Sequence, residues 1–219
     1  EALKSTIDST DDFIDIFGDI PCLRATLEKD ESESWADERH TKPSMESLRE
    51  IYRKLRPGEP IQVDAALTLI HNFFFDAKRY DIAPVGRYKF DKKLAISARI
   101  KNHRLARDVV SPITGEILFE ADHVLSFDEA RQVEDAAVNE VWLKLDNGNE
   151  LKVFSNNTCW PEKILGDDLH DCGVKEKCRT STLLAIMEEC GGDLDAIKAA
   201  VKERIAELCP KHITRDDIF

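Results

Sequence analysis

The sequence predicts an α+β fold that is mostly helical and carries an inserted module with a β-hairpin and a helical-hairpin insertion. Apolar residues recur at helical spacing in the first third of the chain. Apolar and polar residues alternate on both sides of Asn147-Gly148, and two apolar helical runs flank Gly191-Gly192. We therefore expect a helical core over 1–107 that resumes at 211–219, a small α+β module over 108–158 and a helical insertion over 159–210.

The N-terminal part is expected to hold a short helix, a polar loop and a longer helix. Residues 9–17 place acids between apolar residues at helical spacing, and Gly18 ends that helix. The stretch 28–42 is polar and is predicted to be a loop. The longer helix is capped by Ser44 and ends before Pro57-Gly58; its apolar face comprises Met45, Leu48, Ile51, Tyr52 and Leu55.

A further helix begins near Val63, and a loop and a basic segment follow it. The helix is expected to bury one face, and Phe73–Phe75 are interpreted as an aromatic plug of the core. Pro84 and Gly86 interrupt the next residues, so 76–90 are predicted to form a loop. The apolar residues between 94 and 105 permit one short helix. The buried face is expected to comprise Val63, Ala66, Leu67, Ile70 and Phe74.

The remaining elements follow from local signals. Two short β runs surround a turn within 108–119, and Ser126 with Glu129 forms a capping box that predicts a helix. The Asn147-Gly148 hairpin follows. The last two helices are expected to pack as a core, with apolar positions at Leu183, Leu184, Met187, Cys190, Leu194, Ile197, Val201, Ile205 and Leu208.

The charge is unevenly distributed along the chain. The net charge of −12 argues against a surface that binds nucleic acid throughout. Residues 86–107, however, contain eight Lys or Arg and one Asp, which gives +7 locally and leaves −19 for the rest. This segment is either a face that attracts phosphate or a solvated basic helix.

Several functional classes find no support in the sequence. No apolar run approaches the roughly 20 residues of a membrane span, so we expect no membrane segment. The chain has no phosphate-binding loop, no G-x-S-x-G and no H-E-x-x-H, and we predict no catalytic residues. Six cysteines without a secretory signal indicate reduced thiols and a cytoplasmic protein. No metal site is predicted, although zinc near His170, Cys172 and Cys178 is kept as an alternative.

Residues 51–94 resemble a known family. "IYRKLRPGEP" and "NFFFDAKRYDIAPVGRYKFDKKL" are similar to the lobe region of the beta subunit of bacterial RNA polymerase. "IFGDIPCLRATLEKD", "SPITGEIL" and "KHITRDDI" agree with that family as well. The resemblance covers most of 3–158 and 211–219, whereas 159–210 match nothing that we can name. They are interpreted as a lineage-specific insertion.

The resemblance implies a non-catalytic role. The family synthesises RNA on a DNA template (a nucleotidyltransferase reaction), with Mg²⁺ bound by the beta-prime subunit, so this segment needs no cofactor of its own. The lobe would form part of the wall of the DNA cleft, with DNA and the beta-prime, alpha and sigma subunits as partners. Phosphate contacts are expected from Arg79, Arg87, Lys89, Lys92, Lys93 and Arg99.

Other roles of these residues remain open. Arg87 could instead be a structural residue paired with Glu59 or Asp81. Tyr80 and Tyr88 are expected to pack rather than to stack on bases. The inserted part could alternatively dock a regulatory protein, and an independent zinc-binding domain is a further alternative.

Overall fold

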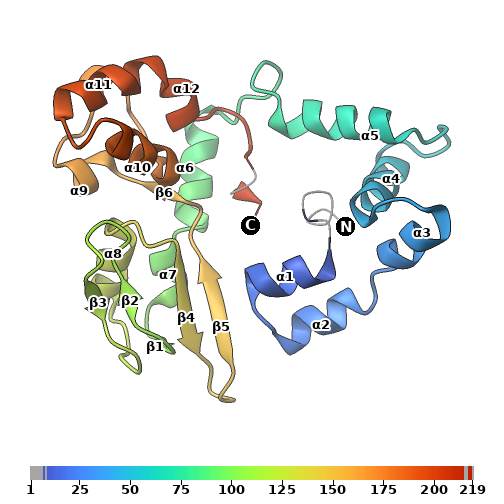
Figure 1. Cartoon of the computed structure of the whole chain (residues 1–219), viewed down its shortest axis with the longest axis horizontal. Helices are drawn as coiled ribbons and strands as arrows, with labels where there is room; N and C mark the ends of the chain where they lie inside the picture. Colours follow the sequence, from blue (N-terminus) through green and yellow to red (C-terminus); the bar gives the residue numbers. More distant parts are fainter. Residues whose placement is uncertain (1–6, 8, 215–216, 219) are drawn as a thin grey trace. The chain divides into compact units, whose positions relative to one another are not determined.

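The computed structural model describes residues 7, 9–214, 217 and 218, and the chain divides into two compact units. Unit 1 comprises 1–80 and 212–219, and unit 2 comprises 81–211. Helices dominate, and the strands of the described residues form small antiparallel sheets in unit 2 (Figure 1). The predicted α+β class is thereby confirmed.

Unit 1 is helical in its described part. Leu48 and Tyr52 pack against Ala66 and Ile70 to form its core. The two helices that supply these residues are each amphipathic, because their apolar residues recur every three or four positions. The helices of unit 1 are α1 (Thr10–Phe17), α2 (Pro21–Leu27), α3 (Ser32–Arg39), α4 (Pro43–Leu55) and α5 (Val63–Ile70), and a π-helical turn (His71–Phe75) follows α5.

Two predictions about the region before α4 are wrong. The polar stretch 28–42 contains α3, because the Asp30 carboxylate accepts the N–H of Ser32 at 2.8 Å and Ala36 is buried. Helix α4 begins at Pro43, so Ser44 lies inside its first turn and is not its cap. Proline suits that first position because the N–H it lacks would have no partner in the helix.

The predicted aromatic plug is also wrong. Phe73 and Phe74 are exposed to 48% and 42%, and Leu67 on α5 is exposed to 54%. Successive side chains of a helical turn point in different directions, so three adjacent rings cannot all face one core. Tyr80 is partly buried, as expected, and its ring lies edge-on to that of Phe74 with centroids 6.3 Å apart.

Unit 2 opens with α6 (Ala83–Lys93) and α7 (Ile96–Ile100). The prediction of a loop over 76–90 is therefore wrong from Ala83 onward. Pro84 occupies the first turn of α6, where it disrupts no helical hydrogen bond, and Gly86 is accommodated within the helix. Tyr88 is 63% exposed, which contradicts its predicted packing role.

The strands of unit 2 form three small antiparallel sheets. One sheet has the order β1–β4–β5, and the others pair β2 with β3 and β6 with β7. In the predicted hairpin, Lys144 pairs with Glu150, and Gly148 takes the positive φ of 83° that glycine favours. The strands are β1 (Arg104–Leu105), β2 (Val109–Val110), β3 (Ile117–Phe119), β4 (Glu140–Lys144), β5 (Glu150–Phe154), β6 (Thr158–Cys159) and β7 (Cys178–Arg179).

Two cores stabilise unit 2. In the first, α7 and α8 (Phe127–Asp135) pack on the β1–β4–β5 sheet around Ile96, Leu105 and Leu143. Helix α8 begins with the predicted capping box of Ser126 and Glu129. The second core lies among the C-terminal helices, where Leu183, Ile186, Ile197, Val201 and Leu208 are buried. These helices are α9 (Pro161–Leu165), a 3-10 turn (His170–Cys172), α10 (Thr180–Glu189), α11 (Leu194–Glu203) and α12 (Ile205–Leu208).

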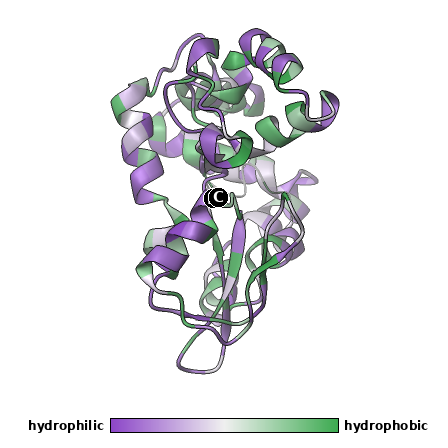
Figure 2. Ribbon diagram, turned by 90° about the vertical axis from the view of Figure 1, so that its left-hand side faces the viewer, coloured by the Kyte–Doolittle hydropathy of each residue, from purple (hydrophilic) through white to green (hydrophobic). Residues whose placement is uncertain are grey.

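The helices carry both hydrophilic and hydrophobic residues (Figure 2). Among the described residues, no helix has the length and the apolar character that crossing a bilayer would require.

The two ends of unit 2 meet. The N–H of Ile82 donates to the carbonyl of Lys211 at 2.8 Å, as a segment inserted into another domain requires. Within unit 1, the returning chain is fixed by the N–H of Ile213, which donates to the carbonyl of Phe74 at 3.0 Å. The division after Tyr80 does not test the functional boundaries 1–107, 108–158 and 159–210, which stay predictions.

Candidate nucleic-acid interface

Helix α6 carries most of the predicted phosphate-binding residues. Its start is fixed by Asp81, whose carboxylate accepts the N–H of Ala83 at 2.8 Å. Lys92 and Lys93 lie in its last turn, where positive charge is stabilised by the helix dipole. The structure thus has a helix in the region where the sequence predicted a basic segment.

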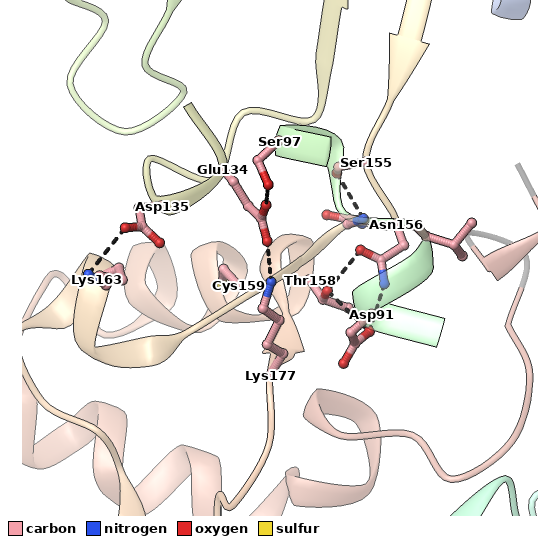
Figure 3. Close-up of polar contacts among 12 residues, drawn as sticks. Asp91, Ser97, Glu134, Asp135, Ser155, Asn156, Thr158, Cys159, Lys163 and Lys177 are labelled. Atoms are coloured by element: carbon pink, nitrogen blue, oxygen red, sulfur yellow. Dashed lines mark hydrogen bonds and ion pairs between the residues drawn. The ribbon is translucent and has the colours of Figure 1, made fainter. Parts of the chain in front are cut away.

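One face of α6 is anchored inside unit 2. Arg87 and Asp91, one helical turn apart, are exposed to only 5% and 8%. The Arg87 guanidinium donates to the carbonyl of Pro210 at 3.2 Å. The Asp91 carboxylate accepts from Nδ2 of Asn156 at 2.7 Å and from Oγ1 of Thr158 at 3.5 Å (Figure 3). These contacts set the rotation of α6 about its axis.

A second polar cluster fixes α7 and α8 beside this anchor. The Ser97 hydroxyl and the Lys177 ammonium both donate to the Glu134 carboxylate, the latter at 2.6 Å (Figure 3). Burial by itself would raise the pKa of Glu134. The hydrogen bonds from Lys177 and Ser97 outweigh that effect, and the pKa of Glu134 is lowered. Glu134 therefore stays ionised and holds both partners.

The opposite face of α6 presents three lysines to solvent. Lys89, Lys92 and Lys93 are exposed, and their spacing of three and four residues places them on neighbouring positions of the helix surface. Within the described part of the chain, none of these ammonium groups has a carboxylate at ion-pair distance. The charge of these three ammonium groups is therefore not neutralised by an ion pair within the described residues.

The other predicted residues are Arg87, Arg99 and Arg79, and each has a different setting. Arg87 is buried, as a structural residue would be, but the partner described for it is the carbonyl of Pro210 and not the predicted Glu59 or Asp81. Arg99 on α7 donates to the carbonyls of Leu94, at 2.7 Å, and Phe154, and partial burial lowers its pKa. Arg79 lies in unit 1, where it is exposed and pairs with Asp76 (Nε–Oδ2 3.4 Å).

Sequence reasoning missed a groove beside Lys92. It has a volume of about 570 Å³ and includes exposed aromatic and basic side chains from segments far apart in the sequence. The available signal was weak, since Trp160 before Pro161 and the lysines around Glu176 resemble ordinary surface residues. The aromatic and uncompensated basic residues of this groove are Tyr88, Lys92, Phe127, Arg131, Trp160 and Lys175.

The cysteine-rich part offers no ligand set for the zinc alternative. In the described ranges, no three His, Cys, Asp or Glu residues lie together in a way that could hold a metal ion. Cys159 and Cys178 are buried opposite each other on β6 and β7, with their sulfur atoms 3.8 Å apart. Their thiols belong to the second core of unit 2.

Comparison with known proteins shows that the chain is similar to one part of a longer subunit. No family model matches it. The DNA-directed RNA polymerase subunit beta of Clostridioides difficile (strain 630) is 43% identical over 208 residues, which cover 95% of this chain and 16% of that protein. The same subunit of Clostridium beijerinckii is 43% identical over 211 residues, and that of Clostridium novyi is 42% identical over 208, again with 16% of each relative covered.

These alignments cover nearly the whole chain. The chain is homologous to a segment that makes up about one sixth of these subunits. Because 208 of 219 residues are aligned, most of 159–210 also has a counterpart in the clostridial proteins.

Proposed function

We propose that this chain, a homologue of one segment of the RNA polymerase beta subunit, is the lobe that forms part of the wall of the DNA cleft. Identity of 43% over 95% of the chain is the observation that carries this proposal. The role is in transcription, in the cytoplasm, and the partners are DNA and the beta-prime, alpha and sigma subunits.

The segment acts without chemistry of its own. RNA synthesis by the whole nucleotidyltransferase would use Mg²⁺ held by the beta-prime subunit. The lobe would guide DNA through the positive potential of Lys89, Lys92 and Lys93. Lysine contacts to phosphate position a duplex without reading its sequence, so the interaction is weak and sensitive to salt.

The salt dependence of DNA binding by the 219-residue chain tests this function. Lys89→Ala with Lys93→Ala removes two charges and leaves Lys92 and the groove intact. The slope of log K against log salt should fall by about 1.8, because each phosphate contact contributes about 0.9. Fluorescence anisotropy with a labelled duplex measures it. The charge-matched control is Lys29→Ala with Lys202→Ala. Lys29 lies between α2 and α3, Lys202 lies on α11, and both are exposed.

An equal slope for both double variants would refute phosphate contact by α6. In the whole polymerase, the reversed pair Lys89→Glu and Lys93→Glu should shorten the lifetime of promoter open complexes and leave the rate of nucleotide addition nearly unchanged. An unaltered lifetime would argue against a position of this helix along the DNA.

A further inference from the structure

The groove in unit 2 combines three exposed aromatic side chains from three separate segments. Tyr88 on α6 is 63% exposed, Phe127 at the start of α8 is 51% exposed, and Trp160 before α9 is 40% exposed. Large aromatic residues usually bury most of their surface, and their enrichment on a surface is typical of protein interfaces. A volume of about 570 Å³ accommodates a few side chains of a partner.

Four carboxylates and four cations line this groove, but they differ in how they are paired. Three of its carboxylates are engaged within unit 2: Asp91 binds Asn156, Glu134 binds Lys177, and Asp135 pairs with Lys163 at 3.2 Å. Glu176 is the fourth, and burial raises its pKa.

The groove's remaining cations lack such partners. Lys92, Arg131 and Lys175 have no carboxylate at ion-pair distance in the residues that the structure describes. Arg131 lies over the Phe127 ring at 5.4 Å from its centroid, and Lys101 lies over it at 5.6 Å. The groove thus offers apolar surface beside three cations that have no carboxylate at ion-pair distance.

We propose that this groove binds a short acidic segment of a separate protein, whose phenylalanine, tryptophan or leucine side chains pack against Tyr88, Phe127 and Trp160. Its carboxylates would pair with Lys92, Arg131 and Lys175. Aromatic anchors and arginine dominate the binding energy of many interfaces, and complementary charge adds specificity. The proposal gives a site and a ligand class to the alternative that this chain docks a regulatory protein. It does not depend on contact of Lys89 and Lys93 with duplex DNA.

A peptide fits this groove better than a single strand of nucleic acid. Glu176 and the engaged carboxylates lie among the cations, so a polyphosphate would meet repulsion that a peptide avoids by placing an uncharged residue there.

Fluorescence anisotropy with a defined probe tests the proposal. The probe is a short fluorescein-labelled peptide that alternates pairs of glutamates with single phenylalanines or leucines. Arg131→Glu with Lys175→Glu should weaken its binding to the 219-residue chain at least tenfold, and so should Tyr88→Ser with Trp160→Ser. Lys202→Glu, on the exposed surface of α11, should leave binding within twofold. Circular dichroism of each variant establishes that the chain is folded.

Four outcomes would overturn the proposal. The first is that the wild-type chain does not bind the peptide, and the second is that the groove variants bind it as tightly as the wild type. The third is that labelled oligothymidylate binds more tightly than the peptide and is equally sensitive to the groove variants. The fourth is binding by the isolated chain but not by the whole polymerase, because the polymerase would then cover the groove itself. Loss of duplex binding by Lys89→Ala with Lys93→Ala is a separate result, since neither residue lines the groove.

Discussion

Replacing Asp91 by alanine should destabilise unit 2 more than any exposed change on the same helix. The carboxylate is 8% exposed and accepts from Nδ2 of Asn156 at 2.7 Å, and Asn156 is itself 5% exposed. The Thr158 hydroxyl keeps a hydrogen-bond partner in this variant, because it also donates to Oδ1 of Asn156 at 2.9 Å. The loss therefore includes the charged hydrogen bond to Asn156.

The contact with Asn156 gives the order of magnitude of the loss in stability. A hydrogen bond to a charged group contributes roughly 1.5–3 kcal/mol, and leaving the buried amide of Asn156 unpaired costs about 1–3 kcal/mol. The two figures overlap, so we expect a loss of about 3 kcal/mol in the free energy of unfolding. With a urea m-value of about 2 kcal/mol per molar, the midpoint should fall by about 1.5 M.

Urea unfolding followed by tryptophan fluorescence measures this loss. Trp142 and Trp160 lie in unit 2 and Trp35 in unit 1, so the signal reports mainly on the unit that contains Asp91. Asp91→Asn, which retains one acceptor oxygen, should lose less than Asp91→Ala. Lys89→Ala, on the exposed face of α6, should change stability by less than about 0.5 kcal/mol. Equal midpoints for Asp91→Ala and Lys89→Ala would refute the anchoring of α6 through Asp91.

Two further predictions concern α8. The pKa of Glu134 is lowered in the folded chain, so its ionised contacts stabilise the fold above the unfolded pKa of about 4.3 and are lost as the pH falls below it. The stability difference between wild type and Glu134→Gln should therefore be largest near neutral pH and shrink between about pH 5 and pH 3; a difference that is constant with pH would contradict this. Ser126→Ala removes the side-chain half of the capping box and should cost about 1 kcal/mol in thermal or urea unfolding, with Ser126→Thr retaining most of it. No loss of stability in Ser126→Ala would show that the cap contributes nothing.

The elements that could be predicted from sequence are those with local signals. The Asn147-Gly148 hairpin depends on a glycine that tolerates positive φ, and α8 depends on reciprocal bonds between Ser126 and Glu129. The helices around Gly191-Gly192 follow from apolar periodicity. Each signal lies within a few residues, so no knowledge of distant contacts is needed.

Other elements were mispredicted because the same residue type is compatible with more than one local structure. Pro84 ends a helix in most positions but starts one in α6, and Gly86 is tolerated once α6 packs on unit 2. The polar α3 shows little amphipathic pattern. An apolar side chain is not always buried, and the exposure of Phe73 and Phe74 depends on how the chain folds around them.

The sequence by itself determined that a basic segment exists, that it follows a polymerase-like motif and that the surrounding chain is acidic. Tertiary structure alone decided which basic residues face solvent. Arg87 and Asp91 point inward because they bind Pro210 and Asn156. These partners lie 123 and 65 residues further along the chain, so the sequence near α6 does not reveal them. Those contacts fix the rotation of α6, and a helical rotation of 100° per residue then leaves Lys89, Lys92 and Lys93 outside. The groove beside them has the same origin, because folding brings its aromatic and basic side chains together from four separate segments.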